Sequence, residues 1–257
     1  MQMAFDFGAV ADMAGVRDTL RDFFGRPDQV SARTPIGQLV KSSISNRTLD
    51  EVSLAAYQRL VKAYPEWPAL AAASAADVER LIGDVTFPDV KARQLGDALR
   101  IIGGRHSDFD LNFLGRLSVA EALAWLERLP GVGRKVSAST LNFSTLDMPA
   151  FVVDTHVLRV LSRYGFVRNT ADTRTAYDAV MAASSRWSAA ELAELHILMK
   201  RLGQTICRHD RARCFDCPIR RRCKAAAASA RQRTRVRGRD MDDRQGAGRE
   251  LPGFWKE

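Results

Sequence analysis

Cysteine is scarce in this chain of 257 residues, and all four cysteines fall between Cys207 and Cys223. No apolar run approaches the roughly 18 residues that a membrane-spanning helix needs, so we expect no membrane span. The first residues, M-Q-M-A-F-D-F-G, contain an acid and no basic segment, so we expect no secretory signal peptide. These absences predict a soluble, cytoplasmic protein.

Strand patterns are also missing, because no segment shows the alternation of polar and apolar residues that is typical of a β-strand. Hydrophobic residues make up 46% of the chain, which is enough for a sizeable core. Apolar residues recur at helical spacing instead, and this predicts an all-α fold of about ten helices. The main expected helices cover residues 16–24, 36–45, 48–64, 70–82, 90–103, 118–129, 135–143, a stretch after 154, and 191–203.

Acidic residues are too few to balance the basic ones, and the net charge is +9. A basic intracellular protein most often has a polyanionic partner such as nucleic acid. Many basic proteins bind nothing in particular, so charge alone does not decide the function. Five arginines alternate with other residues between 231 and 239, in a segment with few apolar residues. This composition predicts a basic, disordered tail over residues 225–257.

The motif L-P-G-V-G-R-K at residues 129–135 separates two segments with helical periodicity. Ser118, followed three residues later by Glu121, forms a capping box that marks the start of the upstream helix. Gly131 and Gly133 can adopt left-handed backbone angles and allow another backbone to approach closely. Such a hairpin directs free N–H groups of a helix start outward, which suits a DNA phosphate. An ordinary helical hairpin, with glycines for geometry only, explains the same residues.

The four cysteines have the spacing C-x₆-C-x₂-C-x₅-C. In a reducing compartment, clustered cysteines are metal or cluster ligands more often than disulfide partners. Their thiolates suit a four-iron, four-sulfur cluster. Zinc is the alternative, although zinc sites usually have two close cysteine pairs and here only Cys214 and Cys217 are close.

Three elements in this order resemble the endonuclease III family of DNA glycosylases: the L-P-G-V-G-R-K motif, V-D-T-H at residues 153–156, and the four cysteines. The resemblance runs from about residue 31 to 224 and implies the two-domain helix-hairpin-helix fold. A six-helix barrel is expected over residues 32–148. An iron–sulfur cluster domain is expected over residues 1–31 and 149–224, with DNA across the cleft between the two. The family spacing favours a 4Fe–4S cluster on Cys207, Cys214, Cys217 and Cys223.

The resemblance also implies a catalytic pair, Lys135 and Asp154. A lysine amine can attack the sugar and form a Schiff base, which makes a glycosylase a strand-cutting lyase as well. Partial burial at a helix start lowers the proton affinity of a lysine. An ionised Asp154 can stabilise oxocarbenium character at C1′ or accept a proton. A solvated lysine and a simple helix N-cap are the structural alternatives for these two residues.

Further DNA contacts are expected from the hairpin, from V-D-T-H and from two loops. Family members often insert a glutamine into the gap left by the flipped base. In this chain Arg47 stands at that position beside Asn46, and an arginine can donate to a guanine opposite the lesion. Phe87 and Pro88 occupy the loop that supplies an apolar wedge in the family. The predicted DNA-binding residues are Gly131, Val132, Gly133, Arg134, Arg47, Asn46, Phe87, Pro88 and His156.

Taken with the resemblance, these residues predict a monomeric base-excision-repair DNA glycosylase with abasic-site (AP) lyase activity. Its expected partner is double-stranded DNA with damaged bases or abasic sites, in the nucleoid. Oxidised pyrimidines are the expected substrates, although Arg47 departs from the family pattern. One alternative is a uracil or thymine mismatch glycosylase of the same fold. Another is a non-catalytic iron–sulfur DNA-binding protein that senses redox state. An adenine-excising enzyme is disfavoured, because it normally lacks this lysine and has a longer C-terminal domain.

Overall fold

The structure is a computed structural model that describes residues 7–28 and 32–229. Within these ranges the chain forms eleven α-helices, two short 3₁₀-helices and no strand. Two isolated β-bridges join Arg33 to Ser144 and Cys207 to Ala212. The prediction of an all-α fold is therefore confirmed. In the same part of the chain, no helix is both long enough and apolar enough to cross a membrane.

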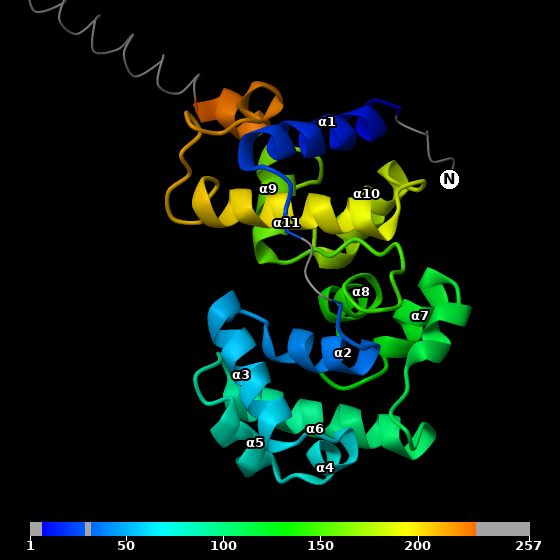
Figure 1. The fold of residues 1–257 in the computed structure, drawn as a ribbon. Coiled ribbons are helices and arrows are strands. Elements are labelled where there is room, and N and C mark those ends of the chain that lie inside the picture. The colour runs from blue at the N-terminus through cyan, green and yellow to red at the C-terminus, as the bar shows by residue number, and fades with distance from the viewer. Residues whose placement is uncertain (1–6, 29–31, 230–257) are drawn as a thin grey trace, which may run out of the picture.

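The helices form two groups that meet at α8 (Figure 1). The first group contains α1 (Phe7–Phe24), α9 (Thr155–Tyr164), α10 (Thr173–Ala183) and α11 (Ala189–Thr205). The second contains α2 (Pro35–Ile44), α3 (Asp50–Ala63), α4 (Trp67–Ala72), α5 (Ala75–Leu81), α6 (Pro88–Arg105), η1 (Asn112–Arg116) and α7 (Val119–Leu126). Helix α8 (Arg134–Asn142) contacts α2 and α7 on one side, and α10 and α11 on the other. The domain boundaries at residues 31/32 and 148/149 stay a prediction.

Side-chain caps set the start of several helices. Ser118 and Ser188 both form complete capping boxes, each with a glutamate three residues later, and the one at Ser118 confirms its prediction. The expected helix over residues 70–82 is instead divided between α4 and α5. The division occurs because Ala73 is extended and the Ser74 hydroxyl accepts a hydrogen bond from the Asp77 N–H at 3.1 Å, which starts a new helix.

The predicted tail begins at residue 225, directly after the loop of Cys223. The 3₁₀-helix η2 (Arg220–Arg222) precedes Cys223, and residues 224–229 are helical. The start of the predicted disordered segment is thus ordered, because helical hydrogen bonding continues directly from the cysteine loop, as in the bond from the Ala227 N–H to the Cys223 carbonyl. The alternating arginines at 231–239 lie outside the described residues.

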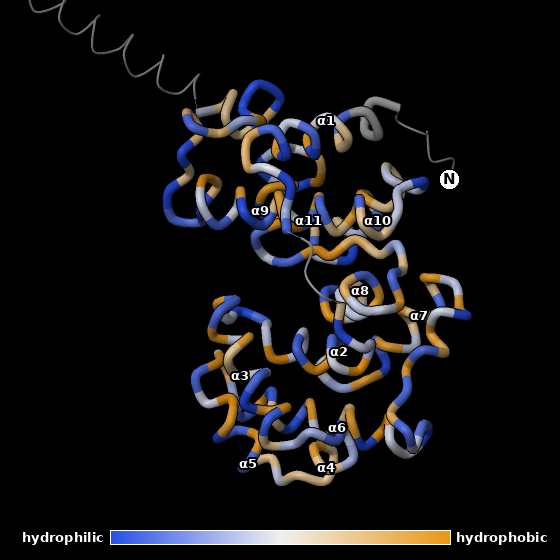
Figure 2. The backbone as a smooth tube through the Cα atoms, in the orientation of Figure 1, coloured by the Kyte–Doolittle hydropathy of each residue, from blue (hydrophilic) through white to orange (hydrophobic). Residues whose placement is uncertain are grey.

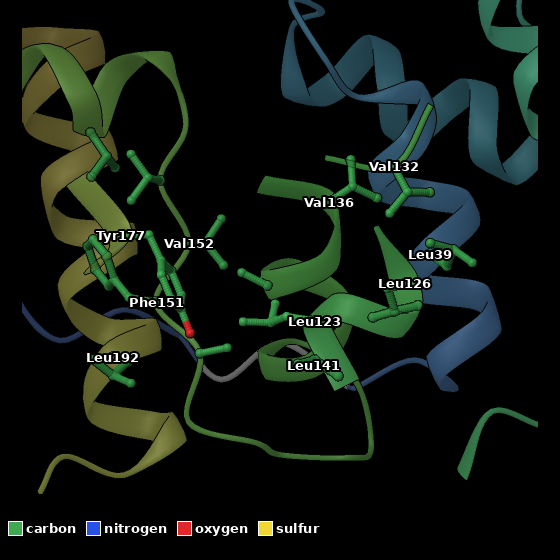
Figure 3. Packing of buried hydrophobic residues seen from close by; sticks show 14 of the residues in the cluster. Leu39, Leu123, Leu126, Val132, Val136, Leu141, Phe151, Val152, Tyr177 and Leu192 are labelled. Atoms are coloured by element: carbon green, nitrogen blue, oxygen red, sulfur yellow. The ribbon is translucent and has the colours of Figure 1, made fainter. Parts of the chain in front are cut away.

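The apolar core runs through both groups of helices (Figure 2). Phe151 and Val152, in the segment between α8 and α9, are almost fully buried. Figure 3 shows these two side chains between Leu141 of α8 and Tyr177 of α10. This segment therefore joins the two groups by apolar packing, which fixes α9 relative to α8.

Glu127, directly after α7, ties three helices together. Its carboxylate accepts hydrogen bonds from Arg134 Nε of α8 at 2.6 Å and from Arg174 Nη2 of α10 at 2.5 Å. Burial alone raises the pKa of Glu127, but the bonds from the two arginines outweigh it and hold the pKa below its ordinary value. The Arg134 guanidinium also lies over the Tyr177 ring, 4.6 Å from its centroid. The Arg134 side chain is thus held in the interior by Glu127 and Tyr177, and its predicted DNA contact stays a prediction.

Replacing Glu127 by alanine should lower the free energy of unfolding by about 3 kcal/mol, because the nearly buried Arg134 loses its partner. Urea denaturation followed by circular dichroism measures the loss. Asp97→Ala is the matched control, since it breaks an ion pair with Arg100 in which both side chains are 56% exposed. That change should cost less than about 1 kcal/mol. Equal losses in the two variants would contradict the role given to Glu127.

Candidate active site

A cleft of about 1590 Å³ opens between α2, α8 and α11. Its wall includes Lys135 and Asp154, so the two predicted catalytic residues line one cavity although they belong to different helices, α8 and α9. Asn46, Arg47 and His156 line the same cleft. The cleft wall does not include Phe87, Pro88 or residues 131–134, which lie elsewhere on the described surface or in the core.

Lys135 lies in the first turn of α8 and is half-buried. Its Nζ is 3.5 Å from the carbonyl oxygen of Ser42 on α2. Burial and, to a lesser degree, the nearby charge of Lys41 lower the pKa of Lys135 to about 8, while Asp154 acts in the opposite direction. About a tenth of the amine is therefore neutral at pH 7, far more than for an exposed lysine. A neutral amine is a nucleophile, whereas an ammonium is not.

Asp154 is the N-cap of α9, as the sequence predicts. Its Oδ1 accepts hydrogen bonds from the backbone N–H groups of His156 at 2.9 Å and Val157 at 2.8 Å. Burial on its own raises the pKa of Asp154, but the hydrogen bond from the Val157 N–H and the charge of Lys200 hold it below its ordinary value. The carboxylate is therefore ionised at neutral pH and has a fixed direction.

His196 of α11 is a buried cleft residue that sequence patterns did not single out. Its Nδ1 lies 2.7 Å from the Val152 carbonyl oxygen, and because a carbonyl only accepts, Nδ1 carries the proton. Burial lowers the pKa of His196 to about 4, so the ring is neutral at pH 7. Backbone hydrogen bonds and lysine charge, rather than a histidine cation, thus keep Asp154 ionised at that pH. A lone histidine in an apolar helix gives no sequence signal for this position.

A polar network forms the contact between α2 and α8. Gln38 Nε2 donates to Ser42 Oγ at 3.1 Å and to Ser139 Oγ at 3.0 Å, and the two hydroxyls are 2.9 Å apart. All three residues line the cleft and are almost fully buried. Lys135, Ser139 and Asn142 follow one another at helical spacing on the cleft face of α8.

Asp50 joins the two groups of helices across the cleft. Lys200 Nζ of α11 donates to Asp50 Oδ1 at 2.6 Å, and Gln204 Nε2 donates to Oδ2 at 3.2 Å. Burial alone raises the pKa of Asp50, but these bonds outweigh it and lower the pKa. Lys41 lies nearby, and burial lowers its pKa. The cleft wall carries three lysines and six arginines against six carboxylates, a positive balance that attracts anions.

The hairpin before α8 fits its prediction in part. Gly131 has a φ of +73°, and a Cβ there would lie 2.6 Å from Gln94 Oε1, so both backbone angle and packing require glycine. Gly133 has a φ of −104°, so the expected left-handed angle is wrong for this residue. An added Cβ at Gly133 would meet no atom within 4 Å, which leaves the start of α8 open. Val132 is buried, so its side chain serves the core.

Two exposed loops lie close together, one after the end of α2 and one before the start of α6. Arg47 and Phe87 have left-handed backbone angles, with φ of +54° and +58°. Both side chains are exposed, and Phe87 is exposed by 56%. Asn46 is exposed beside Arg47, and Pro88 is the first residue of α6. Left-handed angles are rare for such residues, so the surrounding contacts must hold them.

His156 lies in the first turn of α9, between the cleft and the loop of Cys207. Its Nδ1 is 3.1 Å from Arg159 Nη2, whose guanidinium also donates to the Gly203 carbonyl oxygen at 2.7 Å. A Cβ built on Gly203 would lie 2.9 Å from the His156 Cβ, so α11 approaches α9 closely here. These contacts give His156 a packing role, and its DNA contact stays a prediction.

The four cysteines are half-buried and form no disulfide with one another. Burial and, to a lesser degree, the thiols of the other three cysteines raise the pKa of the Cys217 thiol to about 11, so the four groups lie near one another. Arg163 Nη1 donates to Cys207 Sγ at 3.5 Å. In the described ranges, no three His, Cys, Asp or Glu side chains are arranged to hold a single metal ion.

Comparison with known proteins places the chain among repair enzymes. Residues 40–188 match the family described as HhH-GPD superfamily base excision DNA repair protein. Endonuclease III of Thermotoga maritima is 29% identical over 190 residues, which cover 74% of this chain and 83% of that protein. Endonuclease III of a Synechocystis species is 28% identical over 198 residues, which cover 77% and 84% of the two chains.

Solved structures show the same fold. A non-covalent endonuclease III–DNA complex has a TM-score of 0.72 and 22% identity, and the match covers 86% of this chain and 98% of that chain. A thermostable thymine-DNA glycosylase has a TM-score of 0.69 and 15% identity, with the same coverage. At these identities the likeness shows the fold alone.

Proposed function

The chain belongs to the HhH-GPD superfamily of base excision DNA repair proteins, and on that basis we propose that it is a bifunctional DNA glycosylase and AP lyase. The observation that carries the proposal is Lys135, whose pKa is lowered to about 8 in a cleft that Asp154 also lines. A protein that only binds DNA needs neither a neutral buried amine nor an oriented carboxylate beside it. The chemistry therefore belongs to this pair.

Lys135 is the proposed nucleophile. Its neutral amine attacks C1′ of the damaged nucleotide, and the base leaves with the electron pair of the glycosidic bond. The amine then loses a proton, the sugar ring opens, and an imine joins Lys135 to C1′. Loss of a proton from C2′ and departure of the 3′ phosphate cut the strand.

Asp154 is the proposed electrostatic and proton-accepting partner. Its ionised carboxylate stabilises positive charge that develops on the sugar as the base departs. It also accepts the proton that the attacking amine releases. Because two backbone N–H groups of α9 hold Oδ1, the carboxylate needs little reorganisation during the reaction.

Double-stranded DNA is the proposed partner, and a cytoplasmic monomer is the proposed state. The open start of α8 offers backbone N–H groups to a phosphate, and the lysines of the cleft add positive charge. Arg47 and Asn46 extend from the cleft wall, where they can reach the gap left by a flipped base. Phe87 is the proposed apolar wedge beside that gap.

A 4Fe–4S cluster is the proposed cofactor, held by Cys207, Cys214, Cys217 and Cys223. A cluster of this type takes one thiolate per iron, so its four sulfurs stay near one another without converging on one point. The described cysteines support this assignment, because their four thiols lie near one another. When bound, the cluster anchors the loops beside α9 and supplies no step of base removal.

Oxidised pyrimidines are the proposed substrates. A uracil or thymine mismatch glycosylase of the same fold is the second reading, favoured by the arginine at position 47, which can donate to an opposing guanine. The two readings differ in whether a covalent imine forms. A panel of duplexes with one lesion each, tested against all four opposing bases, identifies the base that is released.

Borohydride added to wild-type protein and an abasic duplex should trap a covalent protein–DNA adduct, because it reduces the imine on Lys135. Lys135→Ala should abolish both trapping and strand cutting while duplex binding persists. Asp154→Asn should slow base release at least about a hundredfold and keep the fold, because asparagine also caps helices. The trapping rate should rise about tenfold per pH unit below pH 8 and level off above it, as the amine loses its proton.

Base release without any trapped adduct would mean that water is the nucleophile, and the mismatch-glycosylase reading would replace the lyase. Neither release nor trapping over the whole lesion panel would favour the redox-sensing DNA-binding protein. Trapping that survives in Lys135→Ala would assign the nucleophile to another amine.

The hairpin at residues 129–135 predicts a second result, in which a substitution weakens DNA binding and leaves the free energy of unfolding almost unchanged. Gly133→Ala adds a methyl group where a phosphate must approach, so affinity for a duplex with an abasic-site analogue should fall about tenfold, the worth of one charge-assisted hydrogen bond. Its free energy of unfolding should change little, because the methyl meets no atom within 4 Å. Fluorescence anisotropy and urea denaturation measure the two quantities.

Two glycine controls accompany that experiment. Gly131→Ala should lose more than about 1 kcal/mol of stability, because its φ of +73° and Gln94 both oppose a side chain. Gly104→Ala, in an open position on α6, should leave both affinity and stability nearly unchanged. Unchanged affinity in Gly133→Ala would remove the hairpin from the proposed DNA interface.

The cofactor proposal predicts a yellow-brown purified protein with broad visible absorbance and about four irons per chain. Cys217→Ser should lower the iron content and destabilise the loops around η2, because a lost ligand removes their anchor. Iron analysis and limited proteolysis check both results. A colourless protein with stoichiometric zinc would contradict the cluster.

A further inference from the structure

Lys91 of α6 is an unusual buried cation. It is only 8% exposed, and no carboxylate forms an ion pair with it in the part of the chain that the structure describes. Its Nζ donates to the carbonyl oxygens of Ile44 at 2.9 Å and Asn46 at 2.7 Å, and to Thr48 Oγ1 at 3.1 Å. All three N–H groups of the ammonium are thus directed at one short segment, from the last residue of α2 to Thr48.

The end of α2 supplies the counter-charge that a carboxylate would otherwise provide. Ile44 is the last residue of α2, and its carbonyl belongs to the set that a helix leaves without partners. The carbonyl end of a helix carries partial negative charge, so a lysine there is stabilised. A C-terminal cap needs only one of these bonds, however, and Lys91 makes two more to the loop beyond the helix.

Thr86 ties a second loop to the first. Its N–H donates to Thr48 Oγ1 at 3.1 Å, and its own hydroxyl donates to the Arg47 carbonyl oxygen at 2.7 Å. Thr48 Oγ1 therefore accepts from both Lys91 and Thr86. Together the hydrogen bonds of Lys91 and Thr86 connect the loop that carries Arg47 to the loop that carries Phe87.

These hydrogen bonds explain the left-handed backbone of both loops. Arg47 and Phe87 each adopt a φ near +55°, which costs about 1 kcal/mol or more per residue without glycine. Such angles persist only where the surroundings fix them. Bonds to the carbonyls of Asn46 and Arg47 and to the Thr48 hydroxyl do so on one side, and the start of α6 does so at Phe87.

We propose that Lys91 is a positioning residue for the reading of DNA: it joins the Arg47 loop and the Phe87 loop into one rigid unit, so that both side chains enter the duplex together. The proposal rests on the function proposed above. Its consequence is specificity, because a loop fixed before binding loses less conformational freedom when its side chain contacts the opposing base. Lys91 itself touches neither the sugar nor the damaged base.

The test compares Lys91→Met with wild-type protein. Methionine keeps a similar length and apolar stem but donates no hydrogen bond. Lys62→Met is the matched control, because it removes the same charge from an exposed site on α3. Thr86→Val is the second variant, since it removes only the hydroxyl bond to the Arg47 carbonyl and tests the same coupling if Lys91→Met does not fold.

Two measurements are made on each variant. Hydrogen–deuterium exchange over residues 44–49 and 84–88 reports the coupling of the loops without any substrate. The kcat/KM for a lesion duplex, determined with each of the four opposing bases, reports discrimination. Borohydride trapping on a single-stranded abasic oligonucleotide reports the chemistry alone, because that substrate has no opposing base.

In Lys91→Met, both loops should exchange at least about tenfold faster, and the ratio between the best and worst opposing base should fall at least about fivefold, within the worth of one base contact. Trapping on the single strand should stay within about twofold of wild type. Thr86→Val should show the same pattern with a smaller loss, and Lys62→Met should match wild type throughout.

Faster loop exchange with an unchanged opposing-base ratio would overturn the proposal, because Lys91 would then merely cap α2. An equal loss against all four bases and on the single strand would overturn it for the same reason. If wild-type protein neither traps nor excises, the proposed function fails by itself. In that case, unchanged exchange in Lys91→Met would also overturn the coupling, whereas faster exchange in both loops would support it.

Discussion

The packing of α2 against α8 is the contact on which the cleft depends. Two helices usually meet through apolar side chains, but here Gln38, Ser42 and Ser139 form a buried network in which each hydroxyl has a partner. A satisfied polar contact fixes one register between the helices, because a shifted register would leave these groups unpaired. That register brings Lys135 Nζ within 3.5 Å of the Ser42 carbonyl oxygen. The Lys135 amine is thus placed by its helix partner.

Helix ends supply most of the polar geometry around this contact. Asp154 stands before α9 and Lys135 in the first turn of α8, while Lys91 satisfies the last carbonyl of α2. Backbone groups at helix ends lack partners within the helix, so side chains or ligands must satisfy them. Several helices that end at one cleft therefore create directed donors and acceptors there. The rigid helices behind them keep those directions fixed.

Local signals in the sequence predict the parts of the site that depend on local hydrogen bonds. Asp154 is an N-cap and Ser118 opens a capping box, because both motifs need only residues within three positions. The left-handed angle expected at Gly133 is wrong, because its φ is −104°. The missing side chain at this residue leaves space at the start of α8 and is not needed for the backbone angle. His196 and Lys91 escaped prediction because their roles depend on Val152 and on the end of α2, which are distant in sequence. The Arg134 side chain turns inward for a similar reason, because Tyr177 and Glu127 converge on it only after folding.

The charges of the cleft limit how the low pKa of Lys135 can be maintained. Lys41 and Lys200 lower that pKa in the free protein, but a bound phosphate would offset their positive charge and push the pKa back up. Burial, the largest cause of the shift, lowers the pKa still more when DNA binds, because DNA that covers the cleft removes more water from the amine. A nucleophile that must stay partly neutral beside a polyanion therefore needs a buried position more than it needs cationic neighbours. The first turn of α8, packed against α2, meets that requirement, whereas a lysine on an exposed loop stays almost fully protonated at neutral pH with or without DNA.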